Sequence, residues 1–201
     1  LVDAARAASL GRPALVVSAR EELPATVAFW ERHGFVETSR SSPNVELALA
    51  LDTTFEAPEA EQMRDLGEQV GRSLVAGDLV VLTGELGAGK TTFTQGLGVG
   101  LEVRGGVTSP TFVIARVHPS LVAGPDLVHV DAYRLGGLAE LDDLDLDTSL
   151  DSAVTVVEWG AGLAEGLADS RLEVVIERAV GQGACDELDP RRVSLRWVVG
   201  Q

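Results

Sequence analysis

Cysteine and long apolar runs are scarce in this chain of 201 residues, and each scarcity excludes a class of protein. The one cysteine, Cys185, cannot form an internal disulfide or a thiolate cluster, which favours a reducing compartment. No apolar run approaches the ~18 residues that span a bilayer. The stretch from Leu1 to Arg6 lacks the apolar segment of a signal peptide. We therefore expect a cytoplasmic protein that makes no membrane contact.

Positive charge is scarce as well. The chain has 16 Lys and Arg residues against 31 Asp and Glu residues, and its formal net charge is −15. Neutralising nucleic-acid phosphates needs clustered Lys or Arg, so a role near RNA would need a partner that supplies the positive surface. The stretch Leu138 to Asp151 is itself acidic. It can be interpreted as a solvated face or as a docking surface for a basic partner.

Two segments differ in pattern: residues 1–51 and residues 52–201. The first predicts a β-α-β-β order, with Pro24 in the first turn of its main helix and Gly34 after the last. Its expected elements are a leading helix over Val2–Leu10, a strand over Ala14–Val17, a helix over Pro24–His33, and antiparallel strands over Phe35–Thr38 and Val45–Leu51.

The second segment alternates strands and helices, which predicts an α/β sheet flanked by helices. We expect a linker over Asp52–Pro58, a helix over about Glu59–Val75, a strand over Leu79–Thr83 and a helix over about Lys90–Leu101. The last helix contains three glycines, each costing about 1 kcal/mol relative to alanine, so close packing is expected there. Further strands are expected over Thr111–Val117, Leu127–Val130, Val154–Val157, Leu172–Ile176 and Val193–Val199.

Lys90 is the only lysine, because the other fifteen of the 16 Lys and Arg residues are arginines. It lies in the octet Gly84-Glu85-Leu86-Gly87-Ala88-Gly89-Lys90-Thr91, which matches the phosphate-binding P-loop pattern G-x-x-x-x-G-K-[ST]. Glycines let successive N–H groups face one concavity, and the following helix adds its positive N-terminal dipole. We expect Lys90 to bridge the β- and γ-phosphates and the Thr91 hydroxyl to ligate Mg²⁺. Thr92 is a weaker candidate for an α-phosphate contact.

A P-loop site also needs a carboxylate at the end of another strand, near the Mg²⁺. Asp131 follows the run Leu127-Val128-His129-Val130, and Glu158 follows Val154-Thr155-Val156-Val157. Each is the first acid after a strand that reads as buried, and ligand groups collect at the carboxyl ends of such strands. The alternative for each is a strand-terminal charge in solvent.

Thr111 and Trp159 can each be interpreted in two ways. Thr111 could sense the γ-phosphate or its metal, as switch-loop hydroxyls do, or could simply begin a strand. Trp159 could pack against the nucleotide or belong to the core. The histidines His33, His118 and His129 have no metal-ligand spacing, so we expect no zinc site.

Four of these segments together resemble the bacterial TsaE family, also called YjeE, the P-loop ATPases of tRNA threonylcarbamoyladenosine synthesis. The matching segments, spread over about residues 55–200, are residues 77–93 with the P-loop, Thr108-Ser109-Pro110-Thr111-Phe112, His129-Val130-Asp131-Ala132-Tyr133-Arg134-Leu135 and Val157-Glu158-Trp159-Gly160. A P-loop alone is shared by many families, whereas the set of four is specific.

The resemblance implies a slow ATPase that uses ATP and Mg²⁺ and acts with the TsaD and TsaB proteins, which would hold the tRNA. It implies that Lys90, Asp131 and Glu158 are catalytic and that Thr91, Asp131 and Glu158 lie at the metal. Asp131 resembles the family's Mg²⁺ carboxylate and Glu158 its second essential acid, as base or as metal ligand. Thr111 and Trp159 would join the P-loop residues and Thr92 at the nucleotide.

Residues 1–51 resemble a different family. The run Ala28-Phe29-Trp30-Glu31-Arg32-His33-Gly34-Phe35, between two expected strands, is similar to the C-terminal end of a GNAT acetyltransferase. The pyrophosphate loop of that family is absent, so acetyl transfer is not expected.

Two other functions stay open at this point. One is a small-molecule P-loop kinase, although Arg104, Arg116 and Arg134 are too scattered for an obvious arginine-rich lid. The other is a nucleotide-gated adaptor in which hydrolysis is only a timer.

Overall fold

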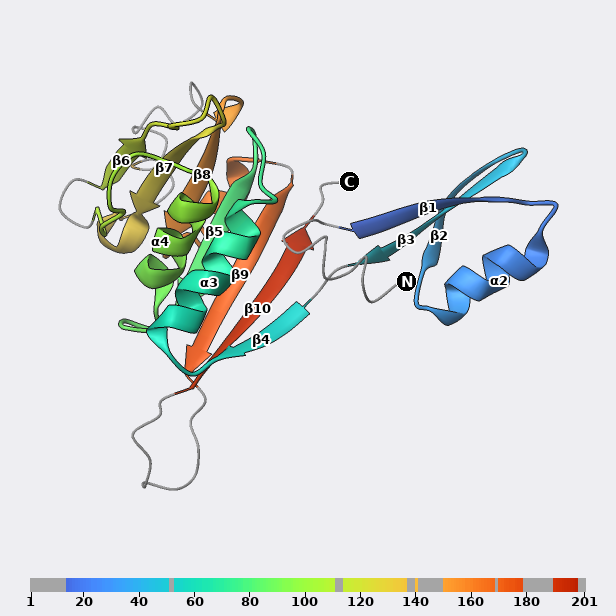
Figure 1. Cartoon of the computed structure of the whole chain (residues 1–201), viewed down its shortest axis with the longest axis horizontal. Helices are drawn as coiled ribbons and strands as arrows, with labels where there is room; N and C mark the ends of the chain where they lie inside the picture. The colour runs from blue at the N-terminus through green and yellow to red at the C-terminus, as the bar shows by residue number, and fades with distance from the viewer. Residues whose placement is uncertain are drawn as a thin grey trace.

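The structure, a computed structural model, describes residues 14–50, 53–110, 114–136, 140, 150–168, 170–178 and 190–198. Its strands form one sheet of three and one sheet of seven, which lie apart along the long axis (Figure 1). Among these residues, no helix is long and apolar enough to cross a membrane. The helix expected over Val2–Leu10 falls outside the described ranges.

The three-stranded sheet is antiparallel with the order β1-β3-β2. It consists of β1 (Ala14–Arg20), β2 (Val36–Ser41) and β3 (Asn44–Ala50), with the helix α2 (Pro24–Arg32) between β1 and β2 in sequence. Val27 of α2 and Phe35 pack on Val45, Leu47 and Leu49 of β3, which forms a small core. The predicted β-α-β-β order is confirmed.

The seven-stranded sheet has the order β4-β10-β9-β5-β8-β7-β6. Its strands are β4 (Thr53–Ala57), β5 (Leu79–Gly84), β6 (Ala115–His118), β7 (Asp126–Asp131), β8 (Ala153–Glu158), β9 (Arg171–Arg178) and β10 (Arg191–Val198). The four central strands β9, β5, β8 and β7 run parallel, and the strands outside them pair antiparallel. The predicted α/β class is confirmed.

The central strands bring three chain segments to one edge of the sheet. All six residues of β8 are buried, as are the first four of β5, which suits strands covered on both faces. Because parallel neighbours end on the same side, Gly84 at the end of β5, Asp131 at the end of β7 and Glu158 at the end of β8 come together. Asp131 pairs directly with Glu158 in the β7–β8 register.

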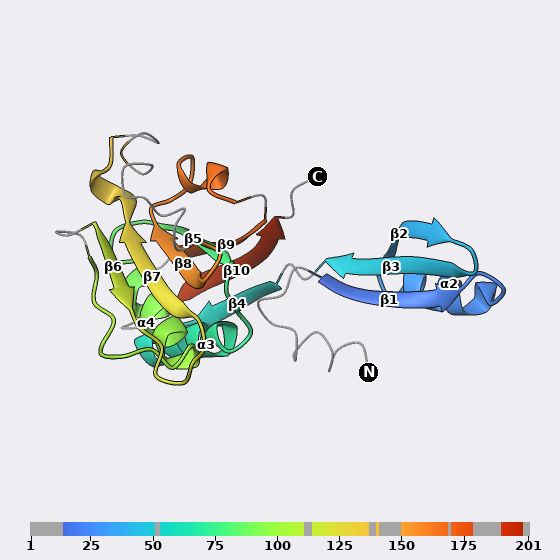
Figure 2. The ribbon, with the colours of Figure 1, turned by 90° about the horizontal axis from the view of Figure 1, so that it is seen from above.

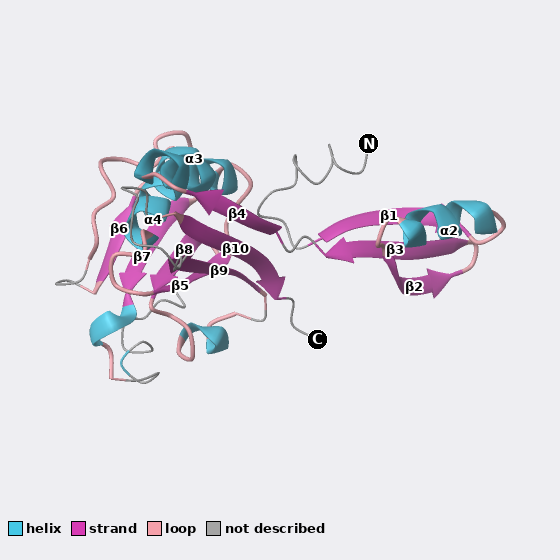
Figure 3. Cartoon of the chain, turned by 90° about the horizontal axis from the view of Figure 1, so that it is seen from below, coloured by secondary structure: helices cyan, strands magenta, loops and turns pink. Residues whose placement is uncertain are grey.

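Two helices cover one face of this sheet, namely α3 (Ala60–Gly71) and α4 (Lys90–Gly100), while the short 3₁₀ helices η1 (Ala132–Arg134) and η2 (Ala164–Gly166) lie on the other (Figures 2 and 3). Apolar residues of α3 and α4 pack on β5, β8 and β9 in the main core. The helices touch through glycines. A Cβ on Gly96 would lie 2.0 Å from the carbonyl oxygen of Arg64, and a Cβ on Gly100 would lie 2.3 Å from that of Glu68. The close packing expected at the α4 glycines is confirmed.

The linker predicted over Asp52–Pro58 is wrong for most of its length. Thr53 to Ala57 form the edge strand β4, which pairs antiparallel with β10 near the other end of the chain. Ala57 is buried and Phe55 packs against the main core. A five-residue edge strand has little periodicity of its own, and its partner is more than a hundred residues away, so the local pattern could not reveal the pairing.

The largest shifts from the predicted element boundaries are in α3 and β6. Helix α3 ends at Gly71, before the expected Val75. The Ser73 hydroxyl donates to the Val70 carbonyl at the helix end, a local bond that competes with further helix. Strand β6 begins at Ala115 rather than Thr111.

Candidate functional site

The octet predicted as a P-loop joins β5 to α4 in a strand–loop–helix unit. Gly87 has a backbone φ of +76° and Gly89, the N-cap of α4, has a φ of +109°. Such left-handed angles cost other residues about 1–2 kcal/mol, which explains the glycines. The turn is held by the Ala88 N–H donating to the Glu85 carbonyl at 3.1 Å. The N-terminus of α4 therefore opens onto the loop, as an anion site requires.

Lys90 is held at this loop by backbone oxygens and an aromatic ring. Its Nζ donates to the Gly84 carbonyl at 2.8 Å and to the Glu85 carbonyl at 3.0 Å. The same nitrogen lies 3.6 Å from the ring centroid of Trp159, a cation–π distance. Burial lowers the pKa of the Lys90 ammonium from its ordinary value, and the nearby carboxylates of Glu158 and Asp131 partly offset this.

Trp159 reaches this position through an unusual backbone. Its φ is +62°, a conformation that large side chains rarely adopt and that concentrates at functional sites. Its N–H donates to the Leu82 carbonyl of β5 at 2.9 Å, which ties the turn after β8 to the strand before the P-loop. The ring also lies 5.1 Å from that of Tyr133, between centroids.

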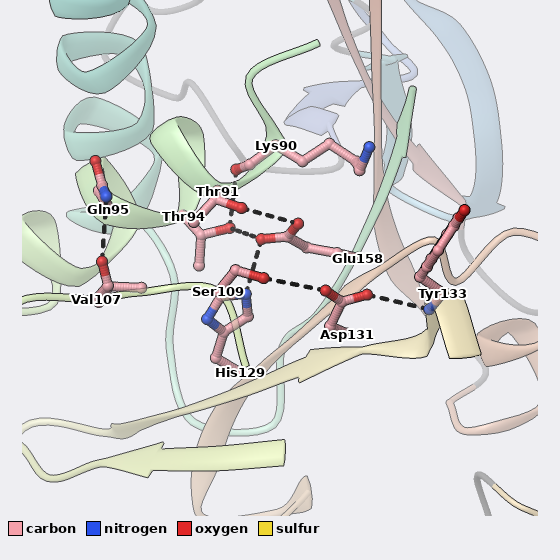
Figure 4. A network of polar contacts seen from close by, with 10 residues as sticks. All are labelled: Lys90, Thr91, Thr94, Gln95, Val107, Ser109, His129, Asp131, Tyr133 and Glu158. Atoms are coloured by element: carbon pink, nitrogen blue, oxygen red, sulfur yellow. Dashed lines mark hydrogen bonds and ion pairs between the residues drawn. The ribbon is translucent and has the colours of Figure 1, made fainter. Parts of the chain in front are cut away.

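Glu158 is only 2% exposed and accepts hydrogen bonds from separate elements (Figure 4). The Thr91 hydroxyl donates to its Oε2 at 3.1 Å. Its Oε1 lies 3.4 Å from the Thr94 hydroxyl and 2.8 Å from Nε2 of His129. Three side chains from α4 and β7 thereby hold one buried carboxyl group in place.

Asp131, 4% exposed, ends the neighbouring strand and is held separately. Its Oδ2 accepts from the Ser109 hydroxyl at 3.1 Å, and its Oδ1 accepts from the Tyr133 N–H at 3.1 Å (Figure 4). The side chain thereby caps η1 and ties it to the segment after α4. Asp131 is therefore fixed at the same sheet edge as Glu158.

These residues line one cleft of about 310 Å³. Its lining is Leu86, Gly87, Gly89, Lys90, Thr91, Thr92, Ser109, Asp131, Tyr133, Glu158 and Trp159. Most residues that the sequence predicted for the site thus line this cleft, including Asp131, Glu158 and Trp159. Gly84 and Glu85 do not line the cleft but accept hydrogen bonds from Lys90 through their carbonyls.

A second cleft, of about 270 Å³, lies between the P-loop and the start of α3. It is lined by Ala57, Pro58, Glu59, Ala60, Met63, Gly87, Ala88, Gly89, Thr92 and Arg191. Gly87, Gly89 and Thr92 belong to both clefts. Thr92, the weaker candidate, therefore lies where the two clefts meet.

Some residues considered for the site lie outside the described residues or do not line either cleft. Thr111 and most of the acidic stretch Leu138–Asp151 lie outside the described residues. Of the described residues that line either cleft, none is Arg104, Arg116 or Arg134, the arginines weighed for a kinase lid.

Sequence reasoning missed His129, Ser109 and Arg191. His129 was set aside because it lacks metal-ligand spacing, yet it stands two residues before Asp131 in a strand. Alternate strand residues share a face, so the pattern His-x-Asp could have signalled a shared site. The sequence pattern could not reveal Arg191, because its contact with the P-loop joins residues 104 positions apart. In this contact, Nη2 of Arg191 lies 3.5 Å from the Gly87 carbonyl oxygen.

Comparison with known proteins now decides the family. The sequence model described as "Threonylcarbamoyl adenosine biosynthesis protein TsaE" matches residues 57–184. The chain belongs to the TsaE family. The resemblance inferred from the four motifs is confirmed, and the family is one of P-loop proteins that bind ATP. The match begins at residue 57, so the acetyltransferase resemblance of residues 1–51 stays a prediction.

Individual TsaE proteins agree with this membership. The tRNA threonylcarbamoyladenosine biosynthesis protein TsaE of Streptomyces coelicolor is 68% identical over 123 residues, covering 61% of this chain and 83% of that protein. The protein of the same name from Mycobacterium bovis is 48% identical over 149 residues, covering 71% and 89%. The crystal structure of YdiB from Bacillus subtilis matches with a TM-score of 0.57 at 30% identity, covering 74% of this chain and 86% of that one.

Proposed function

We propose that this chain binds Mg-ATP and hydrolyses it in support of threonylcarbamoyladenosine formation in tRNA. One observation carries the proposal: the P-loop lysine and threonine share a single cleft with two buried strand-end carboxylates. A P-loop binds phosphate, and acids beside it are what phosphoryl transfer needs for a metal ion and for orienting water. The names of the TsaE relatives supply the pathway.

The donor set of the cleft fits Mg²⁺. This ion prefers oxygen ligands and binds through one or two carboxylates together with substrate phosphates. The cleft offers the Thr91 hydroxyl and the carboxylates of Asp131 and Glu158. Within the described ranges no three His, Cys, Asp or Glu side chains form a metal-holding group. When bound, the ion would offset charge on the β- and γ-phosphates.

The residues of the cleft have separate proposed roles in hydrolysis. The P-loop N–H groups and Lys90 would hold the phosphates, and Thr91 and Glu158 would hold the Mg²⁺ ion. Asp131, steadied by Ser109, supplies the second carboxylate, for the metal shell or for the attacking water. Water attacks the γ-phosphorus, the bond from this phosphorus to the β–γ bridging oxygen breaks, and ADP and phosphate leave.

The second cleft is proposed to receive the base and ribose. It adjoins the P-loop at Gly87 and Gly89 and combines apolar surface from Met63 with the Arg191 side chain. An apolar recess with a few polar groups is the common form of a ligand site. ATP would then extend from this cleft across Thr92 into the catalytic cleft.

Thr91 gives a direct test of the metal assignment. Replacing Thr91 with valine keeps the shape but removes the hydroxyl, and should lower ATP turnover about 10- to 100-fold, the range for losing a bond of about 1.5–3 kcal/mol to a charged group. The Mg²⁺ concentration for half-maximal rate should rise. Thr38→Val, the same change in the three-stranded sheet, is the control. Unchanged rate and Mg²⁺ dependence in Thr91→Val would contradict the assignment.

The link to tRNA modification rests on partners. We propose TsaD and TsaB, because a chain of net charge −15 is poorly suited to hold tRNA alone. The ATPase rate should change when the purified TsaB–TsaD pair is added, and modification of tRNA should require all three proteins with ATP. If the partners change neither rate nor modification, the coupling is wrong even where ATP hydrolysis by the chain alone persists.

A further inference from the structure

His129 is a fully buried polar side chain in contact with the proposed catalytic machinery. Its exposed fraction is 0%, and its Nε2 lies 2.8 Å from Oε1 of Glu158. His129 belongs to β7, two residues before Asp131, and therefore points to the same face of the sheet as that acid. Burying an imidazole in a parallel sheet costs free energy unless its hydrogen bonds are made. An apolar side chain would fill the same space at a lower cost, which indicates that His129 does more than pack.

The hydrogen bonds of Glu158 show what the imidazole does. Oε2 faces Thr91 in the cleft. Oε1 has two possible donors, but the Thr94 hydroxyl carries one hydrogen, and its bond to the Lys90 carbonyl, at 3.0 Å, is shorter than its 3.4 Å approach to Glu158. His129 is therefore the main donor to Oε1. The two carboxylate oxygens of Glu158 thus have different environments. Oε1 is bonded in the protein interior, and Oε2 faces the cleft.

The two ring nitrogens of His129 have different surroundings. Nε2 faces the Glu158 carboxylate, to which an N–H group donates. Among the described residues, Nδ1 is buried without a partner. The hydrogen bond to Glu158 is therefore the polar contact that the described structure gives this ring.

We propose that His129 is a positioning residue for ATP hydrolysis, which holds the Glu158 carboxylate in one rotation so that Oε2 stays on Thr91 and the metal side. The inference rests on the proposed function of the cleft. Partners that orient a ligating carboxylate matter because an unheld group rotates and loses its alignment. His129 itself touches neither nucleotide nor metal in this proposal.

Two variants separate positioning from packing. His129→Phe keeps an aromatic ring and removes the donor, whereas His129→Gln places an amide N–H near the original Nε2. Loss of an outer-shell partner typically costs about 10- to 100-fold, so His129→Phe should lower kcat by that factor while the Kd for ATP measured without Mg²⁺ stays within about threefold of wild type. His129→Gln should recover most of the rate. Equal rates in wild type and His129→Phe would overturn the inference, as would an equal loss in both variants accompanied by equally lowered melting temperatures.

A second readout needs no turnover. Nitrogen-15 NMR of the three histidine rings, with His129→Phe identifying the His129 signals, should show a hydrogen on Nε2 of His129. The Nε2–H proton signal should move in Glu158→Gln. A His129 ring without a hydrogen on Nε2 overturns the inference. If wild type fails to hydrolyse ATP, the proposed function falls, and the NMR result still decides whether His129 orients Glu158.

Discussion

Replacing Lys90 with alanine is expected to weaken ATP binding at least about 30-fold and to reduce hydrolysis below detection. Removing one partner of a buried charge pair costs about 2–5 kcal/mol, and each 1.4 kcal/mol is about tenfold in Kd. Lys90 is 5% exposed and is aimed by the Gly84 and Glu85 carbonyls and the Trp159 ring. No arginine could take over, because a planar guanidinium does not fit the same cradle. Calorimetric titration with ATP and a phosphate-release assay would measure both effects.

The control for Lys90→Ala is Arg40→Ala. Arg40 lies in β2 of the three-stranded sheet and pairs with Glu37 on the surface, so its loss changes the net charge equally without touching either cleft. ATP affinity and turnover should match wild type in this control. Wild-type binding and turnover in Lys90→Ala would show that the cleft is not the ATP site.

Replacing Gly96 with alanine is expected to destabilise the fold by at least about 3 kcal/mol, the upper part of the usual range for overpacking. The new Cβ would lie 2.0 Å from the Arg64 carbonyl oxygen and 2.8 Å from the Glu68 nitrogen. Both are backbone atoms of α3, so relief requires the helices to separate. For a chain of this size the melting temperature should fall by about 6–12 °C or more, which thermal unfolding followed by circular dichroism would detect.

Gly166→Ala is the matched control for this change. Gly166 lies in η2, and a Cβ there meets no atom within 4 Å. Its melting temperature should stay within about 2 °C of wild type, since surface changes are usually within ±0.5 kcal/mol. If Gly96→Ala melts like Gly166→Ala, the backbone contact between α3 and α4 is not as close as described.

The site was largely predictable because its main parts are local. A P-loop is a continuous motif, and the acids Asp131 and Glu158 each follow a strand whose apolar run marks it. Parallel strands end at one edge, so their proximity followed from the fold class alone. What pattern could not supply was the pairing of side chains. The bond from the Thr91 hydroxyl to Glu158 is one such pairing, which neither segment indicates by itself.

The parts that were missed depend on contacts between distant segments. Residues Thr53–Ala57 form strand β4 because they pair with β10. A single five-residue strand in isolation would be unstable. The contact between His129 and Glu158 forms only because β7 and β8 lie side by side in register. The positive φ of Trp159 is likewise invisible in sequence, although it brings the ring over Lys90.

The glycine contacts between α3 and α4 have a consequence for what the protein can bind. Met63 of α3 lines the second cleft, and Lys90 begins α4 at the catalytic cleft. Where backbones touch at Gly67 and Gly96, no side chain is left to compress or rotate between the helices. The contact between α3 and α4 therefore fixes the position of Met63 relative to Lys90. In the proposed ATP site, the base cleft could not move away from the phosphate loop without breaking this contact.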